Sequence, residues 1–356
     1  MSVNVSAQAL VETAQALVAD DKGLLAMDES SPTCNQRFAK LDIPQTEEAR
    51  RAWRELIVTA PGLKESISGA ILFDETFHQK TSTGAPFPMA LTEAGIFPGI
   101  KVDTGAHPLA GHLGEQITEG LDGLRDRLAA YARLGARFAK WRTVIALSTV
   151  NAELPSRGCI VANAHALARY AALCQEAGLV PVVEPEVLMD GEHSAARCEM
   201  VTEEVLHAVF QQLDMQGVLL EGMLLKPNVV LPGLQSAQQQ SADETADATL
   251  RCLLRTVPAA VPGVVFLSGG QPSALASARL NTMNLRYRSR SPWALSFSFA
   301  RAIHQPALEI WRGDANKVGE AQQALLHRAR CNHAARRGEY DALLDPEMHR
   351  PASGQV

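Results

Sequence analysis

The chain has 356 residues, of which 46% are hydrophobic and 20% are charged, and its formal net charge is -6 with an isoelectric point near 6.0. This composition is typical of a globular protein that is long enough to bury a core without disulfides or a metal. The acidic balance argues against a nucleic-acid-binding or membrane-surface protein, although it leaves room for a locally basic site for a small anion.

The cysteines and the N-terminal segment point to an intracellular chain. The six cysteines are scattered, without a CxxC pair or a zinc-type cluster, so reduced thiols are expected. The first twenty residues lack the basic start and long apolar stretch of a signal peptide, and no apolar run approaches the ~20 residues of a membrane span. We therefore expect a cytoplasmic protein with neither nucleic acid nor membrane as a partner.

Short apolar runs rich in strand-forming residues alternate with helix-like segments along the chain. In order, the predicted strands are residues 23–28, 69–75, 99–103, 138–145, 179–187, 222–228, 263–270 and 293–299. Helical periodicity is clearest at residues 121–134, 162–177, 198–213 and 242–255. Eight strands that alternate with helices predict an α/β fold, a parallel eight-stranded (β/α)8 TIM barrel. No GxGxxG motif follows an early strand, which weighs against a doubly wound dinucleotide-binding sheet.

One barrel domain is expected to span residues 1–356. Residues 1–22 are predicted to form an N-terminal helical extension, and residues 235–243 a solvated loop before a helix. Residues 341–356 are rich in turn-forming residues and are predicted to form a loose C-terminal tail.

Polar residues recur at the ends of the predicted strands, and in a barrel the carboxyl ends of the strands meet at one mouth where active sites lie. In chain order these residues are Asp28, Asp74, Glu75, Lys101, Asp103, Glu184, Glu186, Lys226, Ser268 and, just past the last strand, Arg301. Lys140 and Arg142 lie within the fourth strand, two residues apart, and therefore share a face. Three of the eight lysines fall in these strands, which favours a functional role.

Lys226 ends the apolar run GMLLKPN, where a lysine contributes nothing to packing. Burial in apolar surroundings favours the neutral amine, and a second cation such as Lys140 favours it further. A neutral amine attacks a ketone to form a Schiff base, which is an electron sink for cleaving the adjacent C–C bond. Glu184, Glu186 and Asp28 are candidates for the acid–base steps that this chemistry requires.

Two groups of residues are suited to bind anions. The motif LSGG (Leu267, Ser268, Gly269 and Gly270) ends the seventh strand, where glycines let backbone N–H groups approach an oxyanion, and Arg301 follows the eighth. Barrels commonly bind phosphate at these two loops. A second cationic set, Arg37, Lys101 and Arg142, comes from other strands and loops. Two anion sites predict a small-molecule substrate that is phosphorylated at both ends.

Eight motifs, in order and spacing, resemble those of class I fructose-bisphosphate aldolases over about residues 11–340: LLAMDES, ILFDET, GIKVD, FAKWR, VVEPE, LLKPN, FLSGGQ and WALSFSFARA. The resemblance implies that Lys226 forms the Schiff base and that Glu184, with Glu186 beside it, assists dehydration. It implies that Lys140 assists carbinolamine chemistry and that Asp28 takes the proton of the C4 hydroxyl.

The resemblance also implies the substrate contacts and the reaction. The site of the ketone-side phosphate is matched by Ser268, Gly269 and Arg301, with Leu267, Gly270, Ser298 and Ala300 in the same motifs. The other phosphate and the sugar hydroxyls are matched by Ser30, Thr33, Arg37, Lys101 and Arg142. Reversible cleavage of fructose 1,6-bisphosphate in glycolysis and gluconeogenesis, without metal or cofactor and in a homotetramer, would follow.

This chain departs from the animal pattern of the family in three places. The segment 30–33 reads SSPT in place of STGS, so Pro32 stiffens the predicted loop and removes an N–H donor. Ala300 stands where the pattern has glycine. No terminal tyrosine aligns, and Tyr340 is not an evident substitute, so another group is expected to serve proton exchange on the enamine.

Three rival functions remain open from the residues alone. A related Schiff-base aldolase or transaldolase would need one anion site, whereas two are counted here. A metal-dependent aldolase would need a ligand cluster, and His107, His112 and Glu115 lack the spacing of a helix-face metal motif. A non-catalytic scaffolding protein would not require the lysine–carboxylate set. Trp141 is expected to point away from its neighbours and pack against helices.

Overall fold

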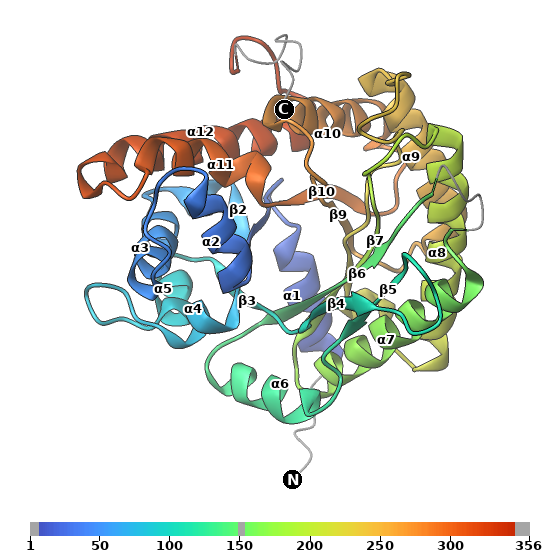
Figure 1. Ribbon diagram of the computed structural model, residues 1–356, viewed down its shortest axis with the longest axis horizontal. Helices are drawn as coiled ribbons and strands as arrows, with labels where there is room; N and C mark the ends of the chain where they lie inside the picture. The colour runs from blue at the N-terminus through green and yellow to red at the C-terminus, as the bar shows by residue number, and fades with distance from the viewer. Residues whose placement is uncertain (1–6, 149–153, 346–356) are drawn as a thin grey trace.

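The computed structural model describes residues 7–148 and 154–345, and their strands close into a barrel of eight parallel strands (Figure 1). Around the barrel the order is β1-β10-β9-β8-β7-β6-β3-β2. The bounds are β1 (Gly23–Met27), β2 (Ile67–Leu72), β3 (Phe97–Lys101), β6 (Phe138–Ile145), β7 (Val180–Val187), β8 (Leu224–Leu225), β9 (Gly263–Phe266) and β10 (Ala294–Phe299). The predicted TIM barrel is confirmed, and each of the eight predicted runs overlaps one barrel strand.

Helices surround the barrel and cover the outer face of its sheet (Figure 1). The first half of the described chain contributes α1 (Ala7–Leu17), α2 (Ser31–Ala39), α3 (Glu47–Val58), α4 (Asp74–His78), α5 (Phe87–Glu93) and α6 (Leu124–Arg133). The second half contributes α7 (Arg157–Glu176), α8 (Ala195–Met215), α9 (Ala242–Thr256), α10 (Ser273–Tyr287), α11 (Arg301–Trp311) and α12 (Val318–Arg337). The four helices predicted from periodicity are α6 to α9.

Five predicted strands end earlier than expected, and three of them, β2, β8 and β9, end earlier by three residues or more. β2 ends at Leu72, and Asp74 and Glu75 begin the short helix α4, where acidic side chains favour a helix N-terminus. β9 ends at Phe266, so the LSGG motif lies in a turn. β8 is only two residues long, and Lys226 follows it directly.

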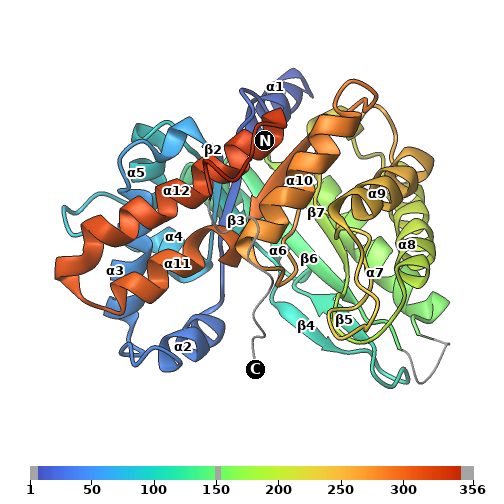
Figure 2. The same ribbon diagram turned by 90° about the horizontal axis from the view of Figure 1, so that it is seen from above.

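Two apolar layers hold the barrel together. A large layer packs the strands against the surrounding helices, and a smaller one fills the amino-terminal end of the barrel with side chains such as Leu17, Phe138, Leu224 and Val265. Gly99 makes room for the Phe138 ring, because a Cβ there would lie 2.2 Å from it. α1 packs against this inner layer, and Figure 2 shows it at the opposite end of the barrel from α2.

Both predicted extensions are partly described. Residues 7–17 of the N-terminal extension form α1, as expected, and residues 1–6 lie outside the described range. The tail is docked where it begins, because Asp345 is buried and ion-paired with Arg328. Residues 346–356 of the predicted loose tail lie outside the described range.

A two-stranded antiparallel hairpin, β4 (Gly105–Pro108) and β5 (Gln116–Glu119), follows β3 and was not predicted. Figure 2 shows it on the same side of the molecule as α2, near the carboxyl ends of the barrel strands. All six cysteines are free, as the sequence predicted, and all six are buried. Among the described residues, no helix is both long and apolar enough to cross a bilayer.

Candidate active site

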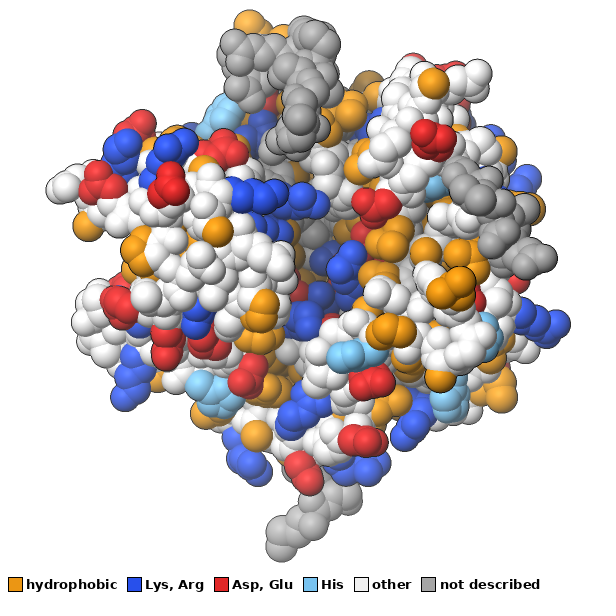
Figure 3. Space-filling view, in the orientation of Figure 1, with side chains coloured by type: hydrophobic (Ala, Val, Ile, Leu, Met, Phe, Trp, Pro, Cys, Tyr) orange, Lys and Arg blue, Asp and Glu red, His pale blue; other side chains and the backbone are white. Residues whose placement is uncertain are grey.

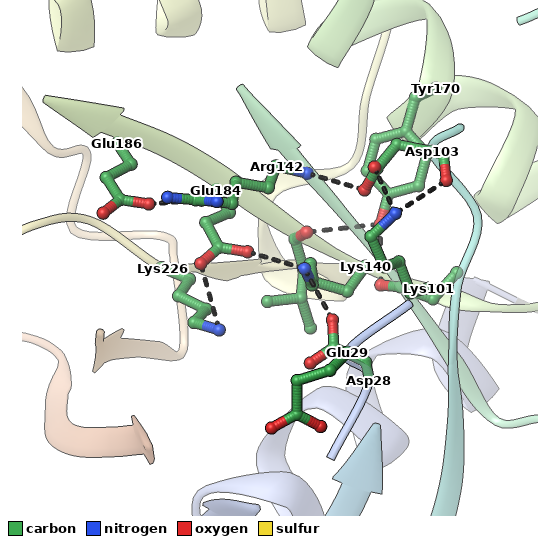
Figure 4. A network of polar contacts seen from close by, with 12 residues as sticks. Asp28, Glu29, Lys101, Asp103, Lys140, Arg142, Tyr170, Glu184, Glu186 and Lys226 are labelled. Atoms are coloured by element: carbon green, nitrogen blue, oxygen red, sulfur yellow. Dashed lines mark hydrogen bonds and ion pairs between the residues drawn. The ribbon is translucent and has the colours of Figure 1, made fainter. Parts of the chain in front are cut away.

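Four side chains from β6, from β7 and from the residues that directly follow β1 and β8 meet inside the mouth of the barrel (Figure 4). Lys226 Nζ lies 3.0 Å from Glu184 Oε1, and Lys140 Nζ lies 3.1 Å from Glu184 Oε2. Lys140 Nζ also lies 2.7 Å from Asp28 Oδ2. All four residues are between 3% and 9% exposed. One carboxylate therefore bridges two lysines, and the second lysine bridges to a second carboxylate.

The strand registers bring these groups together. Lys140 and Arg142 alternate with Trp141 along β6, and Arg142 lies opposite Glu184 of β7. Lys226 is one residue beyond β8, where its N–H still bonds to the carbonyl of Val183 at 2.8 Å. Pro227 follows and ends the ladder, since it has no N–H to donate.

Charge inside the cluster keeps its carboxyl groups ionised. Burial raises the pKa of Glu184, but the charges of Lys140, Lys226 and Arg142 outweigh it and leave that pKa below its usual value. Asp28 behaves in the same way: burial opposes ionisation, and Lys140 and Lys226 bring its pKa below the usual value. Burial by itself would lower the pKa of Lys140, but the charges of its two carboxylate partners raise it by more, so the net shift is upward.

The apolar wall expected around Lys226 is only part of its surroundings. Leu224 and Leu225 are fully buried before it, as predicted. Its closest polar neighbour is a carboxylate, however, and Lys140 is linked to it through that carboxylate. A proton acceptor therefore stands next to the lysine nitrogen, which the apolar argument from sequence did not include.

The side chain of Arg301 lies beside the turn that follows β9, where the sequence predicts a phosphate site. Gly269 and Gly270 have φ of 56° and 90°, which favour glycine, and a Cβ on Gly270 would lie 3.0 Å from Arg301 Nη2. Burial, then the charge of Arg37, lowers the pKa of Arg301. Within residues 7–148 and 154–345, no carboxylate forms an ion pair with its guanidinium. This cation is suited to an anionic ligand.

The second cationic set is arranged differently, because each of its members already has a carboxylate partner. Arg37 pairs with Glu29, Lys101 with Asp103, and Arg142 with Glu186. Together with Lys140 and Arg301 these side chains belong to a basic mouth, and Figure 3 shows Lys and Arg gathered in a hollow at the centre of this face. A phosphate here would share these cations with the resident carboxylates.

Ser30 and Thr33 lie at the start of a helix rather than in a loop. Ser30 is the N-cap of α2, and its Oγ accepts a bond from the N–H of Thr33 at 3.4 Å. Pro32 occupies the first turn, where an N–H has no partner within the helix in any case, so the sequence-based concern about a lost donor is weakened. The sequence analysis was wrong to treat this segment as a loop.

Other predicted contacts are less accessible. The N–H of Leu267 donates to the carbonyl of Pro227 at 3.2 Å, and its side chain is buried, so Leu267 offers the mouth neither group. Ser298 is buried in β10, and its hydroxyl has no hydrogen-bond partner among the described residues. The methyl of Ala300 packs against the inner apolar layer.

Asp74 and Glu75, expected at the mouth, are engaged elsewhere. Asp74 accepts a bond from the hydroxyl of Tyr131 at 2.5 Å, and Glu75 pairs with Arg50 at 2.6 Å. Both residues belong to the first turn of α4 and therefore lie past the end of β2. They do not join the lysine–carboxylate cluster.

A buried network of polar contacts centred on Glu29 was not predicted from the sequence. Glu29 forms ion pairs with Arg37 and with Arg54 at 2.8 Å, and it lies 3.0 Å from His304 Nε2, which links α2, α3 and α11 beside Asp28. Burial raises the pKa of Glu29, but the charge of Arg54 leads the opposing effects, and the net pKa is well below the usual value. The sequence signal was Arg54 itself, because it lies beside Trp53 and Ile57 on the apolar side of an otherwise amphipathic helix.

Three residues that the sequence analysis set aside are accounted for. Trp141 is fully buried and packs against Tyr170 of α7, which confirms its predicted direction. Glu115 accepts two bonds from Ser156, at 2.6 Å from the N–H and 2.5 Å from the hydroxyl. Tyr340 is buried and donates to Asp345 at 2.7 Å, away from the cluster around Lys226.

Comparisons with known proteins agree on one family. Residues 9–352 match the family model described as fructose-bisphosphate aldolase class-I. The chain is 53% identical over 337 residues to "Probable fructose-bisphosphate aldolase class 1" of Xylella fastidiosa (strain Temecula1), with 94% of this chain and 99% of that protein covered. It is 50% identical to "Fructose-bisphosphate aldolase 6, cytosolic" of Arabidopsis thaliana, with 95% and 94% covered.

A solved structure is similar over the same length. The fructose-bisphosphate aldolase of Plasmodium falciparum, crystallised with TRAP and a small-molecule inhibitor, superposes with a TM-score of 0.91 at 46% identity. The match covers 94% of this chain and 95% of that one.

Proposed function

This chain belongs to the class I fructose-bisphosphate aldolase family, and we propose that it cleaves fructose 1,6-bisphosphate reversibly through a Schiff base on Lys226. The enzyme is a carbon–carbon lyase. The products would be dihydroxyacetone phosphate and glyceraldehyde 3-phosphate, and no metal would take part. The single observation that carries this mechanism is the placement of Glu184 between Lys226 and Lys140.

Imine formation needs protons to leave and return beside the reacting nitrogen. The neutral amine of Lys226 attacks the C2 ketone, and a proton on Glu184 then leaves with the carbinolamine hydroxyl as water. At 3.0 Å from Nζ, the Glu184 carboxylate can first accept the ammonium proton and later deliver it. Lys140, at 3.1 Å from the other oxygen, would orient the carboxylate and stabilise the developing oxyanion.

Cleavage needs a base at the other end of the same network. Asp28 would take the proton of the C4 hydroxyl as the C3–C4 bond breaks, and the bonding electrons pass into the imine to form an enamine. The lowered pKa of Asp28 keeps its carboxylate ready to accept that proton. Its contact with Lys140 at 2.7 Å keeps base and imine in one hydrogen-bonded group.

The two phosphates would be bound by two different sets of residues at the mouth. Arg301, which forms no ion pair with a described carboxylate, supports the ketone-side phosphate, together with backbone N–H groups near Ser268 and Gly269. The N-terminus of α2 with Ser30 and Arg37 supports the other phosphate. Because Arg37 already faces Glu29, the second phosphate would be held more weakly than the first.

The remaining expectations from the sequence belong to the same proposal. The enzyme would act in glycolysis and gluconeogenesis, in the cytoplasm, and as a homotetramer with one barrel domain over residues 1–356. The cytosolic label of the Arabidopsis relative supports the location.

A coupled assay tests the proposal against its rivals. Purified enzyme should cleave fructose 1,6-bisphosphate faster than fructose 1-phosphate, and EDTA should leave both rates unchanged. Lys226→Met should abolish both rates, while Lys64→Met, at an exposed site between α3 and β2, should leave both intact. Loss of activity to EDTA would favour the metal-dependent rival, and an inactive wild-type protein would favour the scaffolding rival.

A further inference from the structure

A second group of chemically reactive side chains lies outside the barrel, where α12 meets the start of the C-terminal segment. His327 and Cys331 are one helical turn apart on α12, and Asp345 approaches them from the segment that follows the helix. Cys331 Sγ lies 3.7 Å from His327 Nε2 and 3.9 Å from Asp345 Oδ2. His327 Nε2 lies 3.9 Å from Asp345 Oδ1.

These separations are close to those around one tetrahedral zinc ion. Zinc bonds of ~2.3 Å to sulfur and ~2.0–2.2 Å to nitrogen or oxygen place neighbouring ligand atoms roughly 3.3–3.6 Å apart. The distances of 3.7 and 3.9 Å from His327 Nε2 to Cys331 Sγ and to Asp345 Oδ1 need only a small contraction, and the ligand atoms of the three residues all lie within 4.8 Å of one another. A thiolate, an imidazole and a carboxylate form a ligand set suited to zinc and similar thiophilic cations.

The residues around Asp345 suit it to coordinate a metal ion. Its Oδ2 accepts bonds from Arg328 and, at 2.7 Å, from the hydroxyl of Tyr340. Arg328 is in turn fixed by a bond to Ser277 at 2.7 Å. These bonds fix the position of the Asp345 carboxylate, as the outer partners of metal ligands commonly do.

The site is also accessible from the solvent. The side chain of His327 is 44% exposed, whereas Cys331 and Asp345 are buried behind it. A cation can therefore enter from the solvent side and keep a water in the fourth position. We propose that His327 Nε2, Cys331 Sγ and Asp345 Oδ1 bind one divalent cation of the zinc type, which ties the C-terminal segment to α12.

Binding would replace weak contacts by coordinate bonds. The Cys331 thiol loses its proton to solvent, and its sulfur, the His327 nitrogen and the Asp345 oxygen each form one bond to the cation. The thiolate and the carboxylate together balance the charge of the ion. None of these residues belongs to the cluster around Lys226, so this site is independent of the proposed mechanism and would have a structural role.

Cobalt titration of the metal-stripped, full-length protein tests the site. Co²⁺ should bind with about one equivalent per chain and give a near-ultraviolet thiolate-to-cobalt charge-transfer band, which Zn²⁺ should then remove. Cys331→Ser should abolish the band, and His327→Ala should weaken binding at least ~10-fold. Cys252→Ser, at a buried cysteine of α9, is the matched control and should keep the band.

Thermal unfolding is the second measurement. Zn²⁺ should raise the unfolding temperature of the wild type and of Cys252→Ser, but not that of His327→Ala. If Cys331→Ser does not fold, His327→Ala decides the question, because its side chain is half-exposed. A wild type without a thiolate band, or a band that is unchanged in His327→Ala, would overturn the site and leave the cluster as an ion-paired anchor for Asp345.

Discussion

Lys226 Nζ lies 3.0 Å from Glu184 Oε1, and both side chains are more than nine-tenths buried. The nitrogen proposed to form the imine thus has an ionised carboxyl group as its neighbour. The other oxygen of that carboxyl group contacts Lys140. Protons can move between the two lysines through one side chain, without bulk water.

Glu184→Gln should slow imine formation most. The amide keeps the shape of the side chain but cannot accept the ammonium proton or return it, so kcat should fall ~10²–10⁴-fold, the usual contribution of one acid–base group. Stopped-flow or quench measurement of adduct formation should show the same loss. Glu199→Gln, in an ion pair between α8 and α9, is the control and should keep full activity. Normal adduct formation in Glu184→Gln would contradict the role.

Asp28→Asn should separate the two halves of the reaction. Adducts should still form on Lys226, because Glu184 remains beside it, but the C3–C4 bond should break ~10²–10⁴-fold more slowly. The enzyme should therefore accumulate a covalent substrate adduct that acid quenching or borohydride reveals. Equal loss of adduct formation and cleavage would show that Asp28 acts on the cluster as a whole and not on the C4 hydroxyl.

Arg301→Gln and Arg37→Gln should have different substrate profiles. Loss of Arg301 removes a charged contact to the ketone-side phosphate, so KM should rise about 10–100-fold for both fructose 1,6-bisphosphate and fructose 1-phosphate. Loss of Arg37 should raise KM for the bisphosphate alone, and by less, because Glu29 already engages that guanidinium. Identical profiles in the two variants would contradict two separate phosphate sites.

Stability should fall at acidic pH. Asp28, Glu29 and Glu184 have pKa values below their usual ones in the folded protein. Each therefore contributes stability that is present above its unfolded pKa, near 4, and is lost as pH falls through the lower folded pKa. Urea unfolding between pH 7 and pH 3 should show a free energy of unfolding that drops below about pH 4.5.

Glu184→Gln should flatten this pH dependence, because it removes one of the three titrating groups. Glu93→Gln, on the exposed side of α5, is the control and should leave the slope unchanged. A wild-type free energy of unfolding that is constant down to pH 3 would contradict the lowered pKa values.

The barrel could be predicted from sequence because its strands are buried on both faces. Runs such as those of β1, β8 and β9 are wholly apolar, and a period of two places Lys140 and Arg142 on one face regardless of context. The ends of the strands were harder to predict from the sequence. Asp74 and Glu75 continue a strand pattern, yet they begin α4, since capping preferences override the pattern at a boundary.

Pairs of residues that lie on different elements could not be predicted from the sequence. The pairing of Glu29 with Arg54 joins residues 25 positions apart, and that of Glu29 with His304 joins the segment between β1 and α2 to α11, so no local pattern encodes either pair. The start of α2 was missed because Pro32 suggested a loop, although proline also suits the first turn of a helix. The site residues themselves were proposed from their strand positions and the resemblance, and their roles stay predictions.

The imine on Lys226 is the central claim, and reduction traps it directly. Wild-type enzyme is treated with sodium borohydride in the presence of dihydroxyacetone phosphate, digested, and mapped by mass spectrometry. We predict one reduced adduct, on the peptide that carries Lys226, which is absent from Lys226→Met and present in Lys64→Met. An adduct on Lys140 or another lysine, or none while the enzyme turns over, would contradict the account.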